Sequence, residues 1–227
     1  MRNQAVKQEI EDKSMEVALV ALGKSIARWT EIGEQHVTAV PGLSLFRRDE
    51  PTEPISGMYE PSICLVAQGA KRVLLGDDTY VYDAHHYLIT SVHLPTVVQI
   101  IDASREKPYL GLRLKLDQRE ISQLMVDSNL PPPRAQQSSR GMATGEVTLP
   151  LLTAFQRLID LLAEEKDIPI LAPVIQREII SRLSLGGPYE KLIPMQPSPS
   201  AETPRPLFPN MRFCMVSPFT CSGLPCG

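Results

Sequence analysis

Aromatic residues and long apolar runs are scarce in this 227-residue sequence. Only 5% of the residues are aromatic, and there is a single tryptophan, Trp29. The longest apolar run near the N-terminus, Val17 to Leu22, has six residues. That is too short for a membrane span or for the core of a secretion signal, so we expect a cytoplasmic protein with no membrane partner.

An excess of positive charge is also missing. The 23 basic residues face 26 acidic ones, which gives a net charge of −3 and argues against a protein that seeks phosphate over its whole surface. The glycine-rich phosphate loops of nucleotide-binding proteins and the serine elbow of hydrolases do not occur. With 43% apolar and 22% charged residues the chain is typical of a globular protein, and the sequence nominates no catalytic residue and no cofactor.

Cysteines are few and unevenly placed. Cys64 lies in an apolar run, whereas Cys214, Cys221 and Cys226 fall within the last fourteen residues. A secreted disulfide framework spreads its cysteines through the fold, and these spacings match no zinc ligand set. We therefore expect Cys64 to be a buried small apolar residue and no metal to be bound.

The composition changes sharply after residue 186. Residues 187–227 contain nine prolines and only three basic residues, Lys191, Arg205 and Arg212. Each proline removes a backbone donor and restricts the residue before it, so no helical period survives. We predict that this tail is disordered.

Residues 1–39 are predicted to contain one helix and a lead-in. Ser14 is suited to cap a helix that extends to Trp29. Five apolar residues then form one stripe, namely Met15, Leu19, Leu22, Ile26 and Trp29.

Residues 40–116 are predicted to form about seven short strands, because apolar residues alternate and tight turns such as Gly76-Asp77-Asp78 separate the runs. The run from Tyr109 to Leu116 places leucines on one face and Tyr109, Gly111, Arg113 and Lys115 on the other. No helical crossovers intervene, which favours an antiparallel barrel or sandwich in an α+β, mainly β, fold.

Residues 117–186 are predicted to be mainly helical. A short helix from Asp117 to Asp127 is followed by a loop from Pro131 to Gly145 and by a hairpin of two amphipathic helices, Thr148 to Glu164 and Asp167 to Leu185. Pro173 is expected to kink the last helix or delay its start. The apolar stripes either pack on the strands or form a homodimer interface. The candidate interface residues are Leu151, Phe155, Leu158, Leu162, Leu171, Ile175 and Ile179.

Four polar residues are candidates for binding a ligand: His86, His93, Tyr109 and Arg113. His85 and His86 are adjacent, so in a strand they point to opposite faces, unlike the paired histidines of a metal site. Arg113 has no acidic partner in its own strand, and burial of an unpaired guanidinium is costly. Arg113 therefore reaches solvent, meets a carboxylate elsewhere in the fold, or binds an anionic ligand.

Several segments together resemble the N-terminal domain of AraC-type transcriptional regulators. They are Glu60 to Gly69, then Lys71, Leu75-Gly76, Tyr80, Tyr82-Asp83 and His86-Tyr87-Leu88, then Leu94-Pro95, Ala103-Ser104, Pro108-Tyr109-Leu110 and Leu112-Arg113-Leu114, and finally Ile168 to Pro173, Gln176 to Ile179 and Arg182-Leu183. The resemblance covers about residues 15–186.

The resemblance implies a bacterial cupin-like barrel without obligatory metal that senses a small-molecule effector or mediates dimerisation. A separate domain with two helix-turn-helix motifs binds DNA in that family, and residues 187–227 do not resemble it. We therefore expect a non-enzymatic regulatory domain that does not itself bind DNA. The alternatives are a small metal-dependent cupin enzyme and a protein that only dimerises.

Overall fold

The computed structural model describes residues 2–127 and 141–184. Ten strands form two antiparallel sheets. The larger sheet has the spatial order β1-β2-β9-β4-β7-β10, with bounds Gln35–Val37, Leu43–Arg48, Tyr109–Lys115, Ser62–Gln68, His86–Thr90 and Met142–Glu146. The smaller sheet has the order β3-β8-β5-β6, with bounds Ile55–Tyr59, Leu94–Asp102, Ala70–Leu75 and Asp78–Tyr82.

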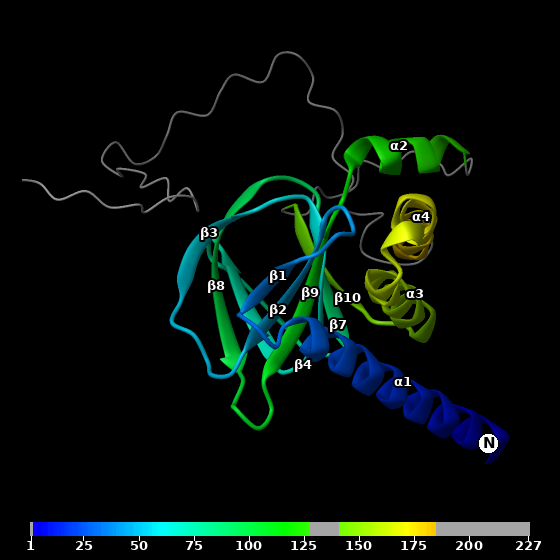
Figure 1. Ribbon diagram of the computed structural model, residues 1–227. Helices are drawn as coiled ribbons and strands as arrows, with labels where there is room; N and C mark the ends of the chain where they lie inside the picture. The colour runs from blue at the N-terminus through cyan, green and yellow to red at the C-terminus, as the bar shows by residue number, and fades with distance from the viewer. Residues whose placement is uncertain (1, 128–140, 185–227) are drawn as a thin grey trace, which may run out of the picture. The chain divides into compact units, whose positions relative to one another are not determined.

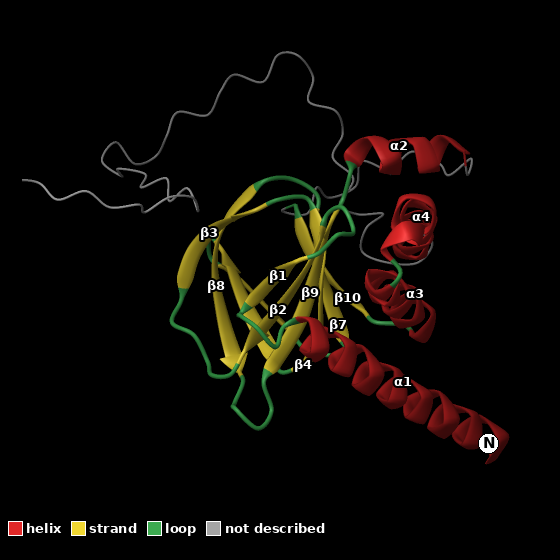
Figure 2. Cartoon of the chain, in the orientation of Figure 1, coloured by secondary structure: helices red, strands yellow, loops and turns green. Residues whose placement is uncertain are grey.

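The helices gather on one side of the larger sheet. They are α1 (Arg2–Trp29), α2 (Gln118–Asp127), α3 (Leu149–Asp160) and α4 (Ile168–Ser184), with two short 3-10 turns between α3 and α4. Figure 1 shows α1, α3 and α4 beside this sheet and the strands β3 and β8 on its far side. The colouring of Figure 2 separates strands from helices in the same way. This confirms the prediction of a mainly β fold with a helical hairpin, and two separate sheets make it the sandwich form.

The larger sheet is buried on both faces, which produces two cores. In β4, Ile63 and Leu65 face the helices, whereas Cys64 and Val66 face the smaller sheet. The predicted burial of Cys64 is confirmed, since it is 6% exposed. The leucines of β9 lie in the helix-side core and Tyr109 in the core between the sheets, as the alternation predicts.

Three strands were not predicted from the sequence: β1, β3 and β10. β10 falls mostly within the loop predicted from Pro131 to Gly145, and it pairs with β7. The sequence of β10, Met142 to Glu146, has no apolar alternation, so the pairing with the buried strand β7 determines its conformation.

The helix bounds also differ from the prediction at two places. α1 begins before Ser14, whose hydroxyl donates to the carbonyl of Ile10 at 2.8 Å within the helix instead of capping it. α4 continues through Pro173 from Ile168. The carbonyl that Pro173 leaves without an intrahelical donor belongs to Pro169, and both prolines are exposed, so this carbonyl is accessible to water.

The expected disorder of residues 187–227 and the three cysteines of that segment lie outside the described residues. Among the residues that the structure describes, no helix combines the length and the apolar character that a membrane span needs.

Candidate functional site

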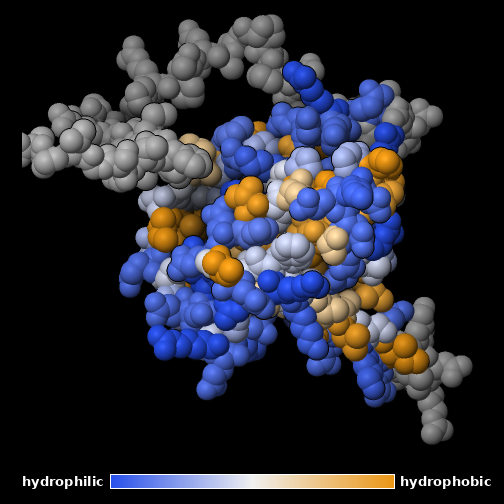
Figure 3. Space-filling view, in the orientation of Figure 1, coloured by the Kyte–Doolittle hydropathy of each residue, from blue (hydrophilic) through white to orange (hydrophobic). Residues whose placement is uncertain are grey.

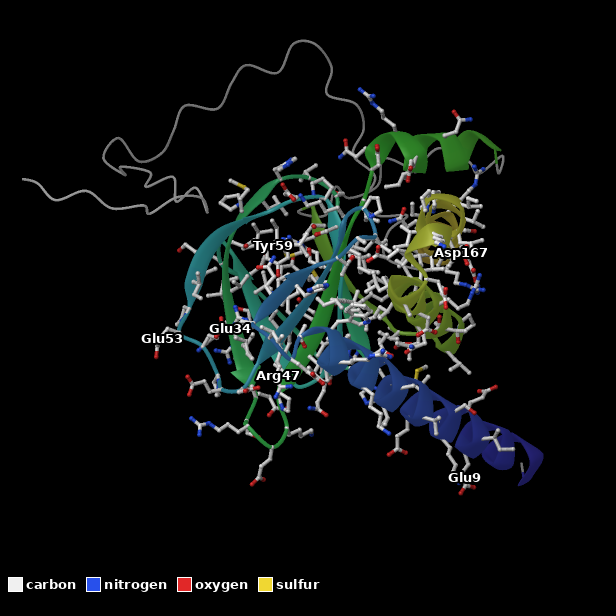
Figure 4. The ribbon with its side chains drawn as sticks, in the orientation of Figure 1. Glu9, Glu34, Arg47, Glu53, Tyr59 and Asp167 are labelled. Atoms are coloured by element: carbon white, nitrogen blue, oxygen red, sulfur yellow. The ribbon has the colours of Figure 1, made fainter. Side chains whose placement is uncertain are left out.

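A cavity of about 190 Å³ lies between the two sheets. Its wall is mostly apolar or aromatic, and seven strands contribute to it. The lining residues are Phe46, Gly57, Met58, Tyr59, Cys64, Lys71, Tyr82, Thr96, Val98, Tyr109, Leu112 and Arg113. Figure 4 shows Tyr59 among the strands, whereas Glu9 and Asp167 lie on the helical side. A largely apolar space with a few polar groups is typical of a small-molecule site.

Strand alternation explains why polar side chains reach this interior. Lys71 lies two residues before Val73, which is fully buried, so both side chains point to the same face of β5. Tyr109 and Arg113 occupy the face of β9 opposite the leucines. Thr96 lies on β8 and is 4% exposed.

Gly111 makes room for one wall of the cavity. A Cβ atom at this position would lie 2.5 Å from the hydroxyl oxygen of Tyr109 and 2.9 Å from its Cζ. The ring of Tyr109 therefore lies across the backbone of Gly111. Tyr109 and Arg113 thus lie on the same face of β9, separated by Gly111, which has no side chain there.

Unpartnered polar atoms concentrate around the cavity. In the described part of the chain, five buried side-chain nitrogen or oxygen atoms have no hydrogen-bond partner. Four of them belong to lining residues: the hydroxyls of Tyr59, Tyr82 and Thr96 and the Nε of Arg113. A buried polar group without a partner costs about 1–3 kcal/mol, so this cluster is poorly satisfied when the cavity holds no ligand.

Two cations face the cavity, and neither forms an ion pair with another side chain in the described part of the chain. The Lys71 ammonium lies 5.5 Å from the centre of the Tyr59 ring, and the Arg113 guanidinium lies 5.7 Å from that of Phe46. Burial lowers the pKa of Lys71, and the positive charge of Arg113 adds to this effect. No lining residue is acidic. The nearby carboxylate of Glu60 forms an ion pair with Lys115, and this pairing is the main reason that the pKa of Glu60 is lowered.

The tyrosines of the site remain protonated. Burial raises the pKa of Tyr59, Tyr82 and Tyr109 well above the ordinary value of 10. The Tyr59 and Tyr82 hydroxyls lie close enough to shift each other's pKa as hydrogen-bonding groups do, but their geometry falls short of a hydrogen bond. Each hydroxyl can therefore donate a hydrogen bond to a ligand at neutral pH.

The structure brings together two of the four ligand-binding candidates. Tyr109 and Arg113 both line the cavity. His86 is exposed, and its Nδ1 lies 3.0 Å from Oδ1 of Asp83. His93 is exposed in the turn before β8 and lines an open depression near Glu60 and Lys115. Neither histidine lines the cavity, because β7 begins at His86 and β8 follows His93, and such strand ends lie beyond the space between the sheets.

The candidate dimer residues lie mostly inside a single chain. Leu171 is 41% exposed, but six of the seven are at most 5% exposed and belong to the helix-side core. These six are Leu151, Phe155, Leu158, Leu162, Ile175 and Ile179. Their apolar stripes cover the larger sheet and α1, so a second subunit would have to contact other faces of the helices.

Lys71, Tyr59, Tyr82 and Thr96 were not among the sequence candidates. The sequence could have indicated Lys71, because it alternates with Val73 and Leu75 and so lies on the face of its strand that is otherwise apolar. The tyrosines and Thr96 look like ordinary strand residues. Only the pairing of β3 with β8 and β5 with β6 places them around one cavity.

Other parts of the surface are hollow but differ in chemistry. A depression of about 660 Å³ is lined by Arg47, Arg48, Glu34 and Asp49, among others. Its charges are paired, with Arg47 to Asp49 at 2.8 Å and Arg48 to Glu34 at 3.2 Å. Within residues 2–127 and 141–184, no three His, Cys, Asp or Glu side chains cluster closely enough to hold a metal ion.

Comparison with solved structures gives distant similarities. An apo form of ToxT from Vibrio cholerae shares 8% identity over 63% of this chain and 56% of its own, with a TM-score of 0.42. ToxT bound to (E)-4-(8-methylnaphthalen-1-yl)but-3-enoic acid gives a TM-score of 0.44 at 8% identity, covering 63% of this chain and 55% of its own. The present chain therefore spans a little over half the length of ToxT.

A cupin-2 domain protein from Shewanella frigidimarina is also similar, with 9% identity over 33% of this chain and 69% of its own and a TM-score of 0.22. No curated protein matches the sequence. The family model of the AraC-type transcriptional regulator N-terminus matches residues 39–189, which is more than half of the chain and includes every strand from β2 to β10. The chain therefore belongs to the family of AraC-type transcriptional regulator N-termini.

Proposed function

We propose that this chain is the effector-binding domain of an AraC-type regulator and that its effector occupies the cavity between the sheets. The observation that carries the proposal is the coincidence of the cavity with four of the five unpartnered buried polar atoms. A ligand there would supply the missing hydrogen-bond partners. Binding would then favour the folded state and alter how the two sheets pack.

A thermal-shift screen against metabolites tests this proposal, because a ligand that binds only the folded state raises the melting temperature. The matched control is Val98→Phe, which fills the cavity from β8, where Val98 is partly buried. We expect hits for the wild type that disappear for Val98→Phe while the variant still melts cooperatively. Hits that persist in Val98→Phe would place the site elsewhere.

We further propose a binding role and not a catalytic one. The cavity wall offers one lysine, one arginine, phenols, a thiol and a hydroxyl, but no carboxylate or imidazole to act as a base. The alternative of a metal-dependent cupin enzyme predicts stoichiometric iron, manganese or zinc in the purified protein. Elemental analysis therefore separates the two hypotheses.

We also propose a homodimer, with a surface that keeps only Leu171 of the seven expected interface residues. Ile170, Leu171 and Val174 lie at i, i+1 and i+4 on α4 and are 71%, 41% and 61% exposed. Figure 3 shows further hydrophobic side chains along α1, where Val17 and Val20 are exposed. Light scattering of the wild type and Val174→Glu tests this, since a charge in the patch should yield monomers. A monomeric wild type at high micromolar concentration would contradict the proposal.

The expected lack of DNA binding and the cytoplasmic location remain predictions. The first depends partly on residues 187–227, which lie outside the described residues. A mobility-shift titration with duplex DNA checks it, and sequence-selective binding below micromolar concentration would contradict it.

A further inference from the structure

We propose that the effector is a small organic anion with an apolar body, whose charged group binds between Lys71 and Arg113. The inference rests on the proposed function and names the ligand class of the same cavity. It starts from hydrogen-bond chemistry. Lysine and arginine can only donate, and hydroxyl groups can donate or accept.

The cavity wall lacks the groups that would recognise a neutral polar ligand. Among the residues that the structure describes, no Asp, Glu, Asn, Gln or His side chain lines it. A sugar or an amide brings its own donors and needs acceptors such as carboxylates or carboxamides around it. A carboxylate brings only acceptors, which matches the unpartnered Nε–H of Arg113 and the hydroxyl of Thr96.

The electrostatics of the wall favour the same ligand class. Among the described residues, Lys71 and Arg113 have no ion-pair partner. Glu60 follows the lining residue Tyr59 in the sequence, but its carboxylate is paired with Lys115. Burial of two like charges in one apolar space is unfavourable unless an opposite charge joins them. A bound anion would neutralise this repulsion, and burial already disfavours the charged form of Lys71 when the cavity is empty.

The volume of the cavity and its apolar lining residues define the part of the ligand outside its charged group. The volume of about 190 Å³ is less than the roughly 300–1,000 Å³ of sites for drug-sized ligands. A space of this size favours a compact ligand over a long-chain acid. Phe46 and Val98 provide apolar contacts, and Met58, which is 56% exposed, marks where the cavity meets the surface. A compact aromatic or branched monocarboxylate fits this description.

The test uses benzoate and its neutral analogues benzamide and benzyl alcohol as probes, with the full chain and isothermal titration calorimetry at pH 7. We expect benzoate to bind at least about tenfold more tightly than either neutral probe. Lys71→Met and Arg113→Met should each weaken benzoate binding at least about tenfold, and Arg113→Lys should restore part of the loss. Arg72→Met is the matched control, because Arg72 is the neighbour of Lys71 on the opposite face of β5 and contacts Gln99 at 3.4 Å.

The outcomes separate the inference from the proposed function. Neutral probes that bind as tightly as benzoate, and lose binding in Val98→Phe, would overturn the anion inference but leave the effector cavity in place. An equal loss in Arg72→Met would show a general effect of charge and overturn the role of Lys71 and Arg113. No binding of benzoate by the folded wild type at 10 mM, on the order of a hundred times weaker than a typical effector, would also overturn it. Circular dichroism of each variant establishes that the fold is retained.

Discussion

The two faces of the larger sheet differ in chemistry although the same strands build both. Toward the helices, β4 and β9 present Ile63, Leu65, Leu112 and Leu114, each at most 2% exposed, against the apolar stripes of α1, α3 and α4. Toward the smaller sheet, the same two strands present Cys64, Tyr109 and Arg113 around a cavity. One face is a close-packed apolar core, and the other contains polar groups without partners.

The face toward the helices contributes to stability, whereas the face toward the smaller sheet is suited to binding a ligand. Close packing of apolar side chains stabilises the fold and leaves no space for a ligand. Polar groups without protein partners and a cavity lower the stability of the free domain, and a ligand that fits the cavity compensates both. We infer that the helix-side core stabilises the sheet and that the sheet can therefore tolerate an imperfect inner face.

The largest expected effect comes from the helix-side core. Phe155 on α3 is fully buried. Phe155→Ala removes most of its buried surface and leaves a cavity, so we expect a loss of about 3–5 kcal/mol in the free energy of unfolding. Urea denaturation followed by circular dichroism measures it. A loss below about 1 kcal/mol would mean that the helices contribute little to stability and would remove the contrast between the two faces.

A matched pair of glycine substitutions should have effects of opposite sign. Gly23 is buried in α1, and a Cβ atom there would lie 3.7 Å from Leu110, an ordinary contact. Gly23→Ala should therefore stabilise the protein by about 0.5–1 kcal/mol through helix propensity. Gly111→Ala would place a Cβ atom against Tyr109 and should cost about 1–3 kcal/mol.

Gly111→Ala should also push the ring of Tyr109 into the cavity and reduce ligand binding. Thermal melts of both variants, with and without benzoate, check the pair. Equal effects of the two substitutions would show that Tyr109 moves freely and that the inner face is not ordered around it.

The sequence predicted the faces of individual strands well, because strand alternation depends only on neighbouring residues. It assigned the leucines of β9 to the helix side and placed Tyr109 and Arg113 together on the opposite face, as the structure has them. The same reasoning left open whether Arg113 meets solvent, a carboxylate or a ligand. The structure disfavours solvent and a carboxylate, because the Nε of Arg113 is buried and has no hydrogen-bond partner among the described residues.

The sequence could not reveal which strands surround the cavity. Lys71 and Thr96 come from β5 and β8, and they approach β9 only because the smaller sheet packs on the larger one. The sequence could not place the two histidines relative to the cavity for a related reason. A polar residue near a strand end looks like a candidate in the sequence, but His86 and His93 lie outside the space between the sheets. Such placement depends on long-range packing and not on local pattern.

The next prediction concerns the pH dependence that Lys71 imposes on stability. Its folded-state pKa is lowered by burial, with Arg113 and Arg48 acting in the same direction and Cys64 against it, while the ring of Tyr59 faces the ammonium. The unfolded chain therefore holds its proton up to about pH 10.5, whereas the folded chain releases it earlier. The cost of the buried charge is fully present below the folded pKa and disappears above the unfolded pKa.

Lys71→Met should consequently stabilise the free protein at pH 7, and this gain should shrink as the pH rises toward 10.5. The difference between the melting temperatures of variant and wild type, measured from pH 7 to pH 10, tests the prediction. Titration of the tyrosines affects both proteins alike and cancels in the difference. A gain that stays constant with pH would indicate that packing, and not charge, explains the substitution.

The smallest expected effect compares two buried threonines that differ in their hydrogen bonds. Thr90 and Thr96 are 1% and 4% exposed. The Thr90 hydroxyl donates to the carbonyl of Glu60 at 2.8 Å and accepts from the backbone N–H of Ser62 at 3.2 Å, whereas the Thr96 hydroxyl has no partner. Valine has nearly the shape of threonine, so the same substitution isolates the hydroxyl at both sites. Thr90→Val should lose about 1–2 kcal/mol of stability, and Thr96→Val should gain up to about 1 kcal/mol while it weakens benzoate binding. Chemical denaturation and calorimetry measure the two quantities. A loss of stability in Thr96→Val would show that its hydroxyl is already satisfied, and the inner face would then be less prepared for a ligand than the structure indicates.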